Sequence, residues 1–398
     1  MKVAIMGYGT IGSGVAKVLD VNKKEIEQRV GEPLELKYIL DLRDLPGDPH
    51  EDCLCKDYMQ IVNDKEVKVV VETMGGVEPA FTFVKAMLES GKSVTTSNKA
   101  LVADKGAELL ATAKANGVNF VFEAAVGGGI PIIRTITDCL TGDVVEEIAG
   151  IINGTTNFML TKMDKEGCEY ADVLAEAQAL GYAEKDPTAD VEGFDACRKI
   201  AILTSLITGQ QVDFEDIPTE GISKITATDF KYAAAMGRSI KLLARSMRSG
   251  DSYTCRVAPF LLNDENMLYH VSSVMNAVYV RGNMLGDSMY YGAGAGSLPT
   301  ASAVVGDMVF LAKNVDRVVP IKWEAEKLEL VDAGKQEFKY FVRTSASENE
   351  VERTFGKVEY VDIDLDNEIG FVTDKMAEAK YQELAASMGS VISMIRLA

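Results

Sequence analysis

The first 125 residues alternate between short apolar runs and segments whose apolar positions recur at helical spacing. Strand-type runs lie at Lys2–Met6, Leu34–Leu42, Val67–Glu72, Ser93–Ser97 and Asn119–Ala124. The helical patterns between them are a long first helix with a polar extension through Arg29, then Pro79–Ser90 and Lys105–Asn116. Alternating strands and helices are typical of an α/β fold, so we expect a Rossmann-like, doubly wound parallel sheet in residues 1–130.

The pattern is less regular in residues 131–318, where we expect an α+β catalytic and dimerisation domain. Strand Glu147–Ile152 leads through a polar turn into helix Phe158–Lys165, and a later helix continues into the apolar run 200–206. Helix Pro299–Lys313 closes this segment, and we expect it to return and pack on the first domain.

From about Val319 the pattern changes to short strands with helices between them. The expected elements are a short helix near Glu350, a longer one at Met376–Met388, and strands at Lys339–Thr344, Lys357–Asp364, Glu368–Thr373 and Ser390–Leu397. The resulting β-α-β-β-α-β order predicts a small ferredoxin-like domain in residues 319–398.

Composition narrows the possible partners of this chain. The 398 residues are 47% apolar, and the net charge of −19 argues against nucleic acid or an anionic membrane as a partner. No apolar run approaches the roughly 20 residues of a membrane span. Cys53 and Cys55 form a lone C-x-C pair, which either binds metal or, as we expect for all six cysteines, remains as free thiols in a reducing cytoplasm.

A glycine-rich turn follows the first strand and opens the first helix. Its sequence is Gly7-Tyr8-Gly9-Thr10-Ile11-Gly12. In this context G-x-G-x-x-G predicts a dinucleotide site: Gly7 permits the tight turn, Gly9 lets the pyrophosphate approach, and Gly12 allows close packing of helix on strand. The phosphates would lie at the helix N-terminus.

The ends of the other predicted strands carry further candidate residues. Asp41 would accept bonds from the ribose 2′-hydroxyl and favour NAD, whereas Arg43 could pair a 2′-phosphate and favour NADP. We expect use of both cofactors with a modest preference for NADP. Thr73 begins a glycine turn after the third strand, and Lys99 at another strand tip either neutralises an anionic ligand or caps a turn at the surface.

The segment 181–199 combines acidic residues and lysines ahead of an apolar run. Asp195 and Lys199 stand four residues apart, so on one helix they project from the same face. A lysine held beside carboxylates at the start of an apolar helix can act as a proton donor. The alternative is a helix N-terminus whose acids favour the dipole and whose lysine is solvated.

These motifs together resemble the homoserine dehydrogenase family over roughly residues 1–315. The matching blocks are Gly7–Gly12, Met74–Ala80, Thr95–Ala103, Phe122–Ile133, Gly150–Met163, Gly181–Lys199 and Gly292–Gly296 with Pro299–Asp307. The block Gly-Tyr-Ala-Glu…Asp-Pro-Thr-Ala-Asp-Val-x-Gly-x-Asp-x-x-x-Lys is highly specific, whereas the glycine fingerprint alone is not.

The resemblance implies roles for individual residues. Lys199 would donate and accept the proton, Asp195 and Asp190 would be substrate-side carboxylates, Glu184 would hold the substrate ammonium, and Lys99 would lie near nicotinamide and substrate. Thr155 lies in the turn Asn153–Asn157, which either offers donors to the substrate or only caps a helix. The metal set would be Glu123 with the carbonyls of Val126, Gly128 and Ile130, holding a monovalent cation, usually sodium. The remaining cofactor contacts would be Gly181, Gly292 and Gly294, although the Gly292–Gly296 loop could be a linker.

The implied activity is the reversible NAD(P)H-dependent reduction of L-aspartate 4-semialdehyde to L-homoserine, in threonine, methionine and isoleucine biosynthesis. We expect a cytoplasmic homodimer or homotetramer. The alternatives are a different amino-acid dehydrogenase on this scaffold, or an amino-acid sensor without chemistry. Intact Lys199, Asp195, Asp190 and Lys99 count against the sensor, because a sensor needs no proton donor.

The C-terminal segment resembles the ACT regulatory domain, with one departure. The effector-binding Asp-x-x-Gly turn of that domain is absent after the first strand, where Ser345-Ala346-Ser347-Glu348-Asn349 stands instead. We therefore expect weak sensitivity or none to threonine, and a structural or dimer-forming role for a truncated ACT-like tail.

Overall fold

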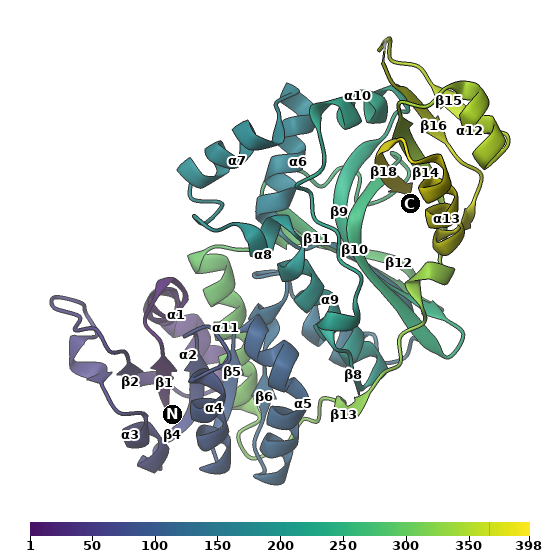
Figure 1. The fold of residues 1–398 in the computed structure, drawn as a ribbon. Coiled ribbons are helices and arrows are strands. Elements are labelled where there is room, and N and C mark those ends of the chain that lie inside the picture. Colours follow the sequence, from purple (N-terminus) through teal and green to yellow (C-terminus); the bar gives the residue numbers. More distant parts are fainter. Residues whose placement is uncertain (366) are drawn as a thin grey trace. The chain divides into compact units, whose positions relative to one another are not determined.

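The computed structural model describes residues 1–365 and 367–398 (Figure 1). Within this part, the chain forms two compact units, each made of several segments. The first unit comprises residues 1–144, 201–214 and 290–328, and the second comprises residues 145–200, 215–289 and 329–398. Among the described residues, no helix is both long and apolar enough to span a membrane.

The described part of the first unit contains a six-stranded parallel sheet in the order β3-β2-β1-β4-β5-β6. The strands are β1 (Lys2–Met6), β2 (Glu35–Leu40), β3 (Leu54–Cys55), β4 (Val67–Glu72), β5 (Ser93–Thr96) and β6 (Phe120–Val121). In β1, four consecutive residues are fully buried, as expected for a parallel strand covered on both faces. The predicted Rossmann-like sheet is confirmed.

The helices of the first unit lie between these strands or return from later in the chain. They are α1 (Thr10–Val21), α2 (Lys23–Val30), α3 (Tyr58–Asn63), α4 (Ala80–Glu89), α5 (Lys99–Ala115) and α11 (Ser297–Lys313). The prediction of one long first helix was wrong, because the helix is interrupted at Asn22, which lies between α1 and α2. Two short strands, β8 (Gln210–Gln211) and β13 (Glu324–Lys327), pair in parallel.

Helix α11 packs on α1 and β1 of the first unit. Ala301, Val304 and Met308 of α11 share one buried apolar cluster with Val15 of α1 and Ile5 of β1. Figure 1 shows α11, coloured green, beside the purple N-terminal elements. A segment almost 300 residues from the N-terminus therefore completes the core around the glycine-rich turn.

The second unit is built on a mixed sheet of ten strands among the described residues. Its order is β12-β11-β7-β9-β10-β18-β14-β16-β15, and β17 pairs with β14. The strands are β7 (Val145–Ile151), β9 (Ser239–Ser249), β10 (Ser252–Leu262), β11 (Met275–Gly282), β12 (Gly286–Ala293), β14 (Glu337–Thr344), β15 (Glu359–Val361), β16 (Ile369–Val372), β17 (Met376–Ala377) and β18 (Val391–Leu397).

The remaining helices are α6 (Gly154–Glu166), α7 (Tyr170–Ala179), α8 (Thr188–Val191), α9 (Phe194–Thr208), α10 (Ala227–Ala235), α12 (Glu348–Phe355) and α13 (Glu378–Met388). Two helices begin earlier than the sequence pattern predicted. Helix α5 begins at Lys99 because the side chain of Asn98 accepts a hydrogen bond from the Leu101 amide. Helix α6 begins at Gly154 because Asn153 accepts from the Thr156 amide in the same way.

The C-terminal segment keeps the predicted β-α-β-β-α-β order, with the short β17 added, but it joins the large sheet. Strand β18 lies between β10 and β14, with Phe260 of β10 opposite Arg396 of β18. Phe260, Tyr340 and Phe371 belong to one buried apolar cluster. The division into consecutive domains at 130/131 and 318/319, and the ACT assignment, stay predictions, whereas the contacts place the tail and the middle segment in one unit.

Candidate active site

The glycine-rich turn has the backbone geometry that its sequence predicts. Gly7 has φ +92°, and a Cβ there would lie 2.9 Å from the Met74 side chain. A Cβ on Gly12 would lie 2.0 Å from the Gly7 carbonyl oxygen, so α1 approaches the turn as closely as glycine permits. A Cβ on Gly9 would meet nothing within 4 Å, so this side of the turn is open. The helix that starts at Thr10 has no side-chain cap, and its first N–H groups suit a phosphate.

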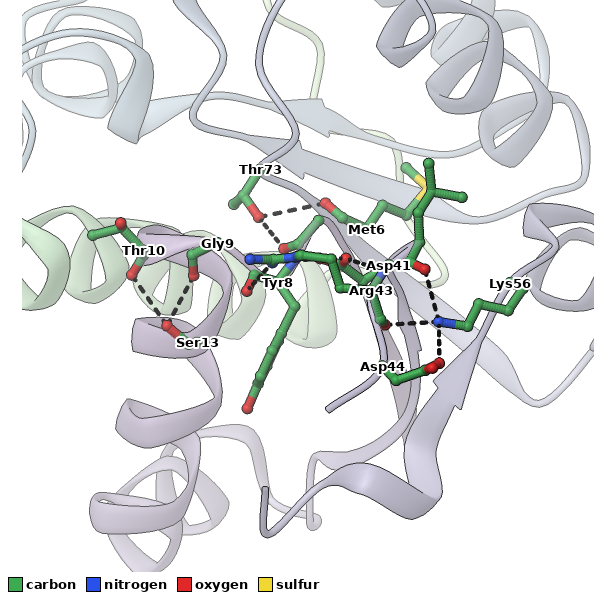
Figure 2. A network of polar contacts seen from close by, with 12 residues as sticks. Met6, Tyr8, Gly9, Thr10, Ser13, Asp41, Arg43, Asp44, Lys56 and Thr73 are labelled. Atoms are coloured by element: carbon green, nitrogen blue, oxygen red, sulfur yellow. Dashed lines mark hydrogen bonds and ion pairs between the residues drawn. The ribbon is translucent and has the colours of Figure 1, made fainter. Parts of the chain in front are cut away.

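Asp41 and Arg43 form a bidentate pair at the rim of this turn, which Figure 2 shows from close by. The Arg43 guanidinium donates to both carboxylate oxygens, at 2.9 and 2.8 Å, and to the Tyr8 carbonyl oxygen at 2.9 Å. The Asp41 carboxylate also accepts from the Tyr8 amide at 2.9 Å. The bond from Arg43 is the main reason that the pKa of Asp41 lies well below its usual range. Asp41 is therefore an ionised carboxylate whose negative charge is balanced by the Arg43 guanidinium.

Lys56 adds a second cation to the same rim, and the sequence analysis missed it. Its Nζ donates to the carbonyl oxygens of Leu42 and Arg43, at 3.0 and 2.7 Å, and pairs with Asp44 at 2.9 Å (Figure 2). No motif marks Lys56, because it comes from the turn after β3, 13 residues beyond Arg43.

Thr73 lies beside the glycine-rich turn, where its hydroxyl donates to the Gly7 carbonyl oxygen at 2.7 Å. The preceding residue, Glu72, is fully buried, and its carboxylate accepts from the Met74 amide at 2.6 Å and the Thr96 hydroxyl at 2.5 Å. Burial raises the pKa of Glu72. Thr96 also accepts from the Asn98 amide at 2.8 Å, so one buried acid organises the ends of β4 and β5 next to Lys99. Sequence analysis did not select Glu72, since it reads as the last residue of an apolar strand.

Glu123 is buried, and its carboxylate is committed to the protein itself. It accepts from the amides of Ile133 and Arg134, at 2.7 and 2.8 Å, and the Arg134 side chain lies 3.3 Å away. No group of three or more His, Cys, Asp or Glu side chains among the described residues is placed to hold a metal ion. The predicted set, which is Glu123 with the carbonyl oxygens of Val126, Gly128 and Ile130, therefore offers mainly main-chain oxygens, and these suit a hard monovalent ion.

Asp307 of α11 shares this buried region and was also missed. Its carboxylate accepts from the Glu123 amide at 2.8 Å and from the Thr95 hydroxyl at 3.0 Å, and it lies 3.5 Å from Arg134. Burial, followed by the nearby Glu123 carboxylate, raises the pKa of Asp307 to about 7. Asp307 thus ties α11 to the turn that follows β6.

The Gly292–Gly296 loop packs on the turn that contains the predicted carbonyl ligands. The Gly129 amide donates to the Ala293 carbonyl oxygen at 3.0 Å, and a Cβ on Gly128 would lie 2.4 Å from the Gly294 carbonyl oxygen. A Cβ on Gly292 would lie 3.2 Å from the Ile130 side chain. Gly292 and Ala293 are the last residues of β12, and the end of this strand from Tyr290 onward belongs to the first unit. The segment Gly292–Gly296 is therefore a packed part of the first unit and not a linker.

In the second unit, Lys199, Asp195 and Asp190 come together around Asn153. The Lys199 Nζ donates to Asp195 Oδ2 at 2.6 Å and to the Ile152 carbonyl oxygen at 2.7 Å. The Asn153 side-chain amide donates to Asp190 at 2.7 Å and to Asp195 at 2.9 Å. Lys199 and Asp195 are 8% and 3% exposed, which rules out a solvated surface pair.

Asn153 therefore has two roles that the sequence showed only in part. Its side-chain oxygen caps α6 by accepting from the Thr156 amide, and its side-chain NH₂ group donates to both carboxylates. The turn Asn153–Asn157 was predicted either to offer donors to the substrate or to cap a helix, and neither alternative joined Asn153 to the two carboxylates. The spacing of 37 and 42 residues to its acidic partners gave no local signal.

The other predicted residues are spread over both units. The Thr155 hydroxyl donates to the Tyr182 carbonyl oxygen at 2.6 Å, next to Gly181, and Glu184 is exposed in the same segment. Lys99 is the first residue of α5 in the first unit. The predicted cofactor residues lie in the first unit, except Gly181, and the predicted substrate residues lie in the second.

Comparisons with known proteins agree with this arrangement. A family model described as homoserine dehydrogenase matches residues 131–309, and one described as homoserine dehydrogenase, NAD binding domain, matches residues 7–123. The homoserine dehydrogenase of Bacillus subtilis is 44% identical over 319 residues, which cover 79% of this chain and 73% of that protein.

Solved structures extend the likeness to the tail. The crystal structure of a homoserine dehydrogenase from Thiobacillus denitrificans is 36% identical with a TM-score of 0.91, covering 100% of this chain and 98% of that one. A hyperthermophilic archaeal homoserine dehydrogenase in complex with NADPH is 27% identical with a TM-score of 0.66, covering 78% and 97%. The chain belongs to the homoserine dehydrogenase family, the NAD(P)-dependent oxidoreductases that interconvert L-aspartate 4-semialdehyde and L-homoserine.

Proposed function

We propose that Lys199 is the proton donor when L-aspartate 4-semialdehyde is reduced to L-homoserine, and the proton acceptor in the reverse reaction. The observation that carries this assignment is the buried cluster in which Lys199 donates to Asp195 and the Ile152 carbonyl oxygen. These two acceptors occupy two of the three ammonium N–H groups, and the third serves the substrate oxygen.

The chemistry requires a cation at this position. NAD(P)H supplies a hydride to the aldehyde carbon, and the carbonyl oxygen gains negative charge as the new C–H bond forms. A nearby ammonium stabilises that charge and transfers its proton to give the alcohol. Oxidation of homoserine requires the Lys199 amine to accept the proton of the alcohol as the hydride leaves.

Asp190 and Asp195 hold the polar end of the substrate and orient Lys199, with Glu184 as the partner of the substrate ammonium and Thr155 as a neighbouring donor. Support comes from Asn153, which keeps Asp190 and Asp195 close to one another through two hydrogen bonds. Two adjacent carboxylates favour a positively charged amino group over a neutral one. For the same reason, an aldehyde without an amino group would bind more weakly than L-aspartate 4-semialdehyde.

The cofactor contacts are the turn Gly7–Gly12, Thr73, Lys99, Gly181 and the loop containing Gly292 and Gly294. Both cofactors are used, with a modest preference for NADPH, because Arg43 occupies both oxygens of Asp41, and a 2′-phosphate at this rim would meet the donors of Arg43 and Lys56 and no unpaired Asp41 carboxylate. The archaeal relative solved with NADPH supports the same preference. Glu123 with the carbonyl oxygens of Val126, Gly128 and Ile130 would hold a monovalent cation, usually sodium, which would stabilise that turn.

The direct test is an assay of NADPH oxidation on addition of L-aspartate 4-semialdehyde, with L-glutamate 5-semialdehyde as the control substrate of greater length. Rapid turnover of the first and slow turnover of the second is the expected result. Equal rates would support a different amino-acid dehydrogenase, and no turnover of either would support the sensor. The proposal includes assembly as a homodimer or homotetramer, which sedimentation of the purified chain would measure. It also includes a cytoplasmic location.

A further inference from the structure

A group of charges, in which Arg256, Arg396 and Glu378 are buried and Glu220 is partly exposed, joins the last strand of the tail to the segment 218–222. Arg396 of β18 is 1% exposed, and its guanidinium donates to both carboxylate oxygens of Glu220, at 2.9 and 2.6 Å. It also donates to both oxygens of Glu378, at 2.9 and 2.7 Å. Arg256 of β10 lies 2.7 Å from Glu378 and 3.4 Å from Glu220, which completes a group of two arginines and two acids.

The segment that carries Glu220 packs directly on the end of α8. The Ile222 amide donates to the Val191 carbonyl oxygen at 2.7 Å, and the Glu220 amide donates to the Val257 carbonyl oxygen of β10 at 2.8 Å. A Cβ on Gly221 would lie 2.2 Å from the Val191 carbonyl oxygen, so even one added carbon would separate the two segments. The segment is therefore fixed to α8 on one side and to β10 on the other.

The same segment also lies against the turn between α8 and α9. Gly193 has φ +81°, and a Cβ there would lie 3.1 Å from the side chains of Thr219 and Val257. Asp190 lies three residues before this glycine, and α9, which carries Asp195 and Lys199, starts one residue after it. The end of α8 and the turn that leads into α9 therefore both pack against the segment 218–222, whose Glu220 is bonded to Arg396.

We propose that Arg396 and Glu220 are positioning residues for the substrate site, through which the C-terminal tail fixes the α8–α9 turn and with it Asp190, Asp195 and Lys199. This inference rests on the proposed role of those three residues in binding and proton transfer. It gives the tail a part in catalysis that requires no effector.

The chemistry of the pair suits a rigid connection. Two parallel N–H···O bonds set the orientation of the carboxylate as well as its distance. Burial raises the pKa of Glu220, but the hydrogen bond and charge of Arg396 outweigh it, so the pKa lies below its usual value and the carboxylate stays ionised. Because small displacements of catalytic groups reduce rates steeply, loss of this connection acts on substrate kinetics.

The tail offers a matched control in a second buried arginine. Arg343 of β14 donates to both carboxylate oxygens of Glu368, at 3.0 and 2.7 Å, and retains Asp229 of α10 as another acidic partner at 2.8 Å. Likewise, Arg396 retains Glu378 when Glu220 is removed. Glu220→Ala and Glu368→Ala therefore each remove one acid that forms a bidentate pair with a buried arginine, but only Glu220 belongs to the segment bonded to Val191.

Steady-state kinetics with L-homoserine and direct titration with NADPH give the first readout. In Glu220→Ala we expect kcat/KM for L-homoserine to fall by about 3- to 30-fold, with Glu220→Gln recovering part of the loss. Affinity for NADPH in Glu220→Ala, and all kinetic constants in Glu368→Ala, should stay within about twofold of the wild type. Equal losses in Glu220→Ala and Glu368→Ala, or unchanged homoserine kinetics in Glu220→Ala, would overturn the proposal.

Amide hydrogen exchange gives a readout that does not depend on activity. Peptides covering residues 187–200 and the Ile222 amide should exchange faster in Glu220→Ala than in the wild type, and as in the wild type in Glu368→Ala. Unchanged exchange in Glu220→Ala would show that the connection positions nothing. If the wild type failed to oxidise homoserine, the proposed function would fail, while hydrogen exchange would still decide whether Glu220 holds the α8–α9 turn.

Discussion

Lys199 and Asp195 lie one helical turn apart on α9, with Nζ 2.6 Å from Oδ2. Both side chains are almost fully buried, so this pair differs from the solvated i,i+4 pairs that contribute little to stability. Burying a lysine and a carboxylate costs free energy that a hydrophobic pair would not. A function in catalysis gives a reason for retaining them.

Replacement of Lys199 by alanine should remove catalysis while cofactor binding remains. We expect kcat to fall by about 10²- to 10⁴-fold, the usual contribution of a general acid. NADPH titration should give an unchanged affinity, because the predicted cofactor residues lie mainly in the first unit. Lys162→Ala is the control, since Lys162 of α6 forms a more exposed i,i+4 pair with Glu166. A Lys199→Ala enzyme with near-normal kcat would disprove the assignment.

Replacement of Asn153 by alanine should reduce both stability and substrate affinity. The N-cap of α6 is lost at a cost of about 1 kcal/mol, and Asp190 and Asp195 lose the amide that joins them. Thermal unfolding and KM for L-homoserine measure the two effects. Asp57→Ala removes an equivalent cap from α3 and should lower stability alone. If Asn153→Ala lowered only the unfolding temperature, the amide would have no part in substrate binding.

Replacement of Arg43 by alanine should shift the cofactor preference toward NADH. The variant loses a donor for the 2′-phosphate and leaves Asp41 without its bidentate partner, so the phosphate meets a carboxylate. We expect the ratio of kcat/KM for NADPH to that for NADH to fall by about 10- to 100-fold. Lys37→Ala removes a cation of β2, the strand that precedes Arg43, where Lys37 pairs with Asp64 and Glu66, and should leave the ratio unchanged. An unaltered ratio in Arg43→Ala would contradict the role of this arginine.

The sequence predicted the elements with a strong local pattern and missed residues that act over long separations. Strand β1 was predicted with its observed bounds, because an apolar run followed by G-x-G-x-x-G specifies both strand and turn. Lys199 and Asp195 were predicted as a pair because four residues separate them on one helix. Asn153 and Asp307 were not selected, since each reaches partners that lie 37 or more residues away in the chain.

The hydrophobic periodicity did not predict where α5 and α6 begin, or that the tail strands join the large sheet. Asn98 and Asn153 each begin a helix several residues before its apolar pattern starts, so the predicted helices α5 and α6 were too short. The tail strands were predicted to form a separate small domain, because their β-α-β-β-α-β order is that of a whole ferredoxin-like domain. Their placement in the large sheet depends on the pairing of β18 with β10, which joins residues 136 positions apart at Phe260 and Arg396.

Stability should depend on pH through Lys241, a buried lysine of β9. Lys241 is 3% exposed and donates to the Val271 carbonyl oxygen at 2.7 Å, and burial lowers its pKa from 10.5 to about 8. Between pH 8 and 10.5 the unfolded chain binds more protons than the folded chain, so this group makes stability rise with pH across that window. The total is on the order of 3 kcal/mol, at 1.36 kcal/mol for each pKa unit.

Lys241→Met should remove this pH dependence. Chemical denaturation at several pH values from 7 to 11 would show a flatter curve for the variant than for the wild type. Lys339→Met, a substitution at an exposed lysine of β14, should leave the curve unchanged. Parallel curves for the wild type and Lys241→Met would show that Lys241 is protonated in the folded state across this range.

Threonine should inhibit this enzyme weakly or not at all. The turn after β14 uses its amides internally: the Ser345 amide donates to the Ser390 carbonyl oxygen at 3.3 Å, and the Ala346 amide donates to the Thr344 hydroxyl at 3.0 Å. Helix α12 then begins with Glu348 and Glu350 in its first turn. Their negative charges disfavour an amino-acid carboxylate at this helix N-terminus, so a ligand there has little free energy with which to shift a conformational equilibrium.

The measurement is a titration of L-threonine against the initial rate at subsaturating L-homoserine, with D-threonine as the control. We expect only the shallow, competitive effect of a poor substrate analogue, since threonine and homoserine share the ammonium group that Glu184 would hold. Saturable, non-competitive inhibition by L-threonine, together with slower amide exchange in residues 337–361, would establish an effector site in the tail. In that case the coupling would have a route to the substrate site, because β14 pairs with β18 and Arg396 of β18 holds Glu220.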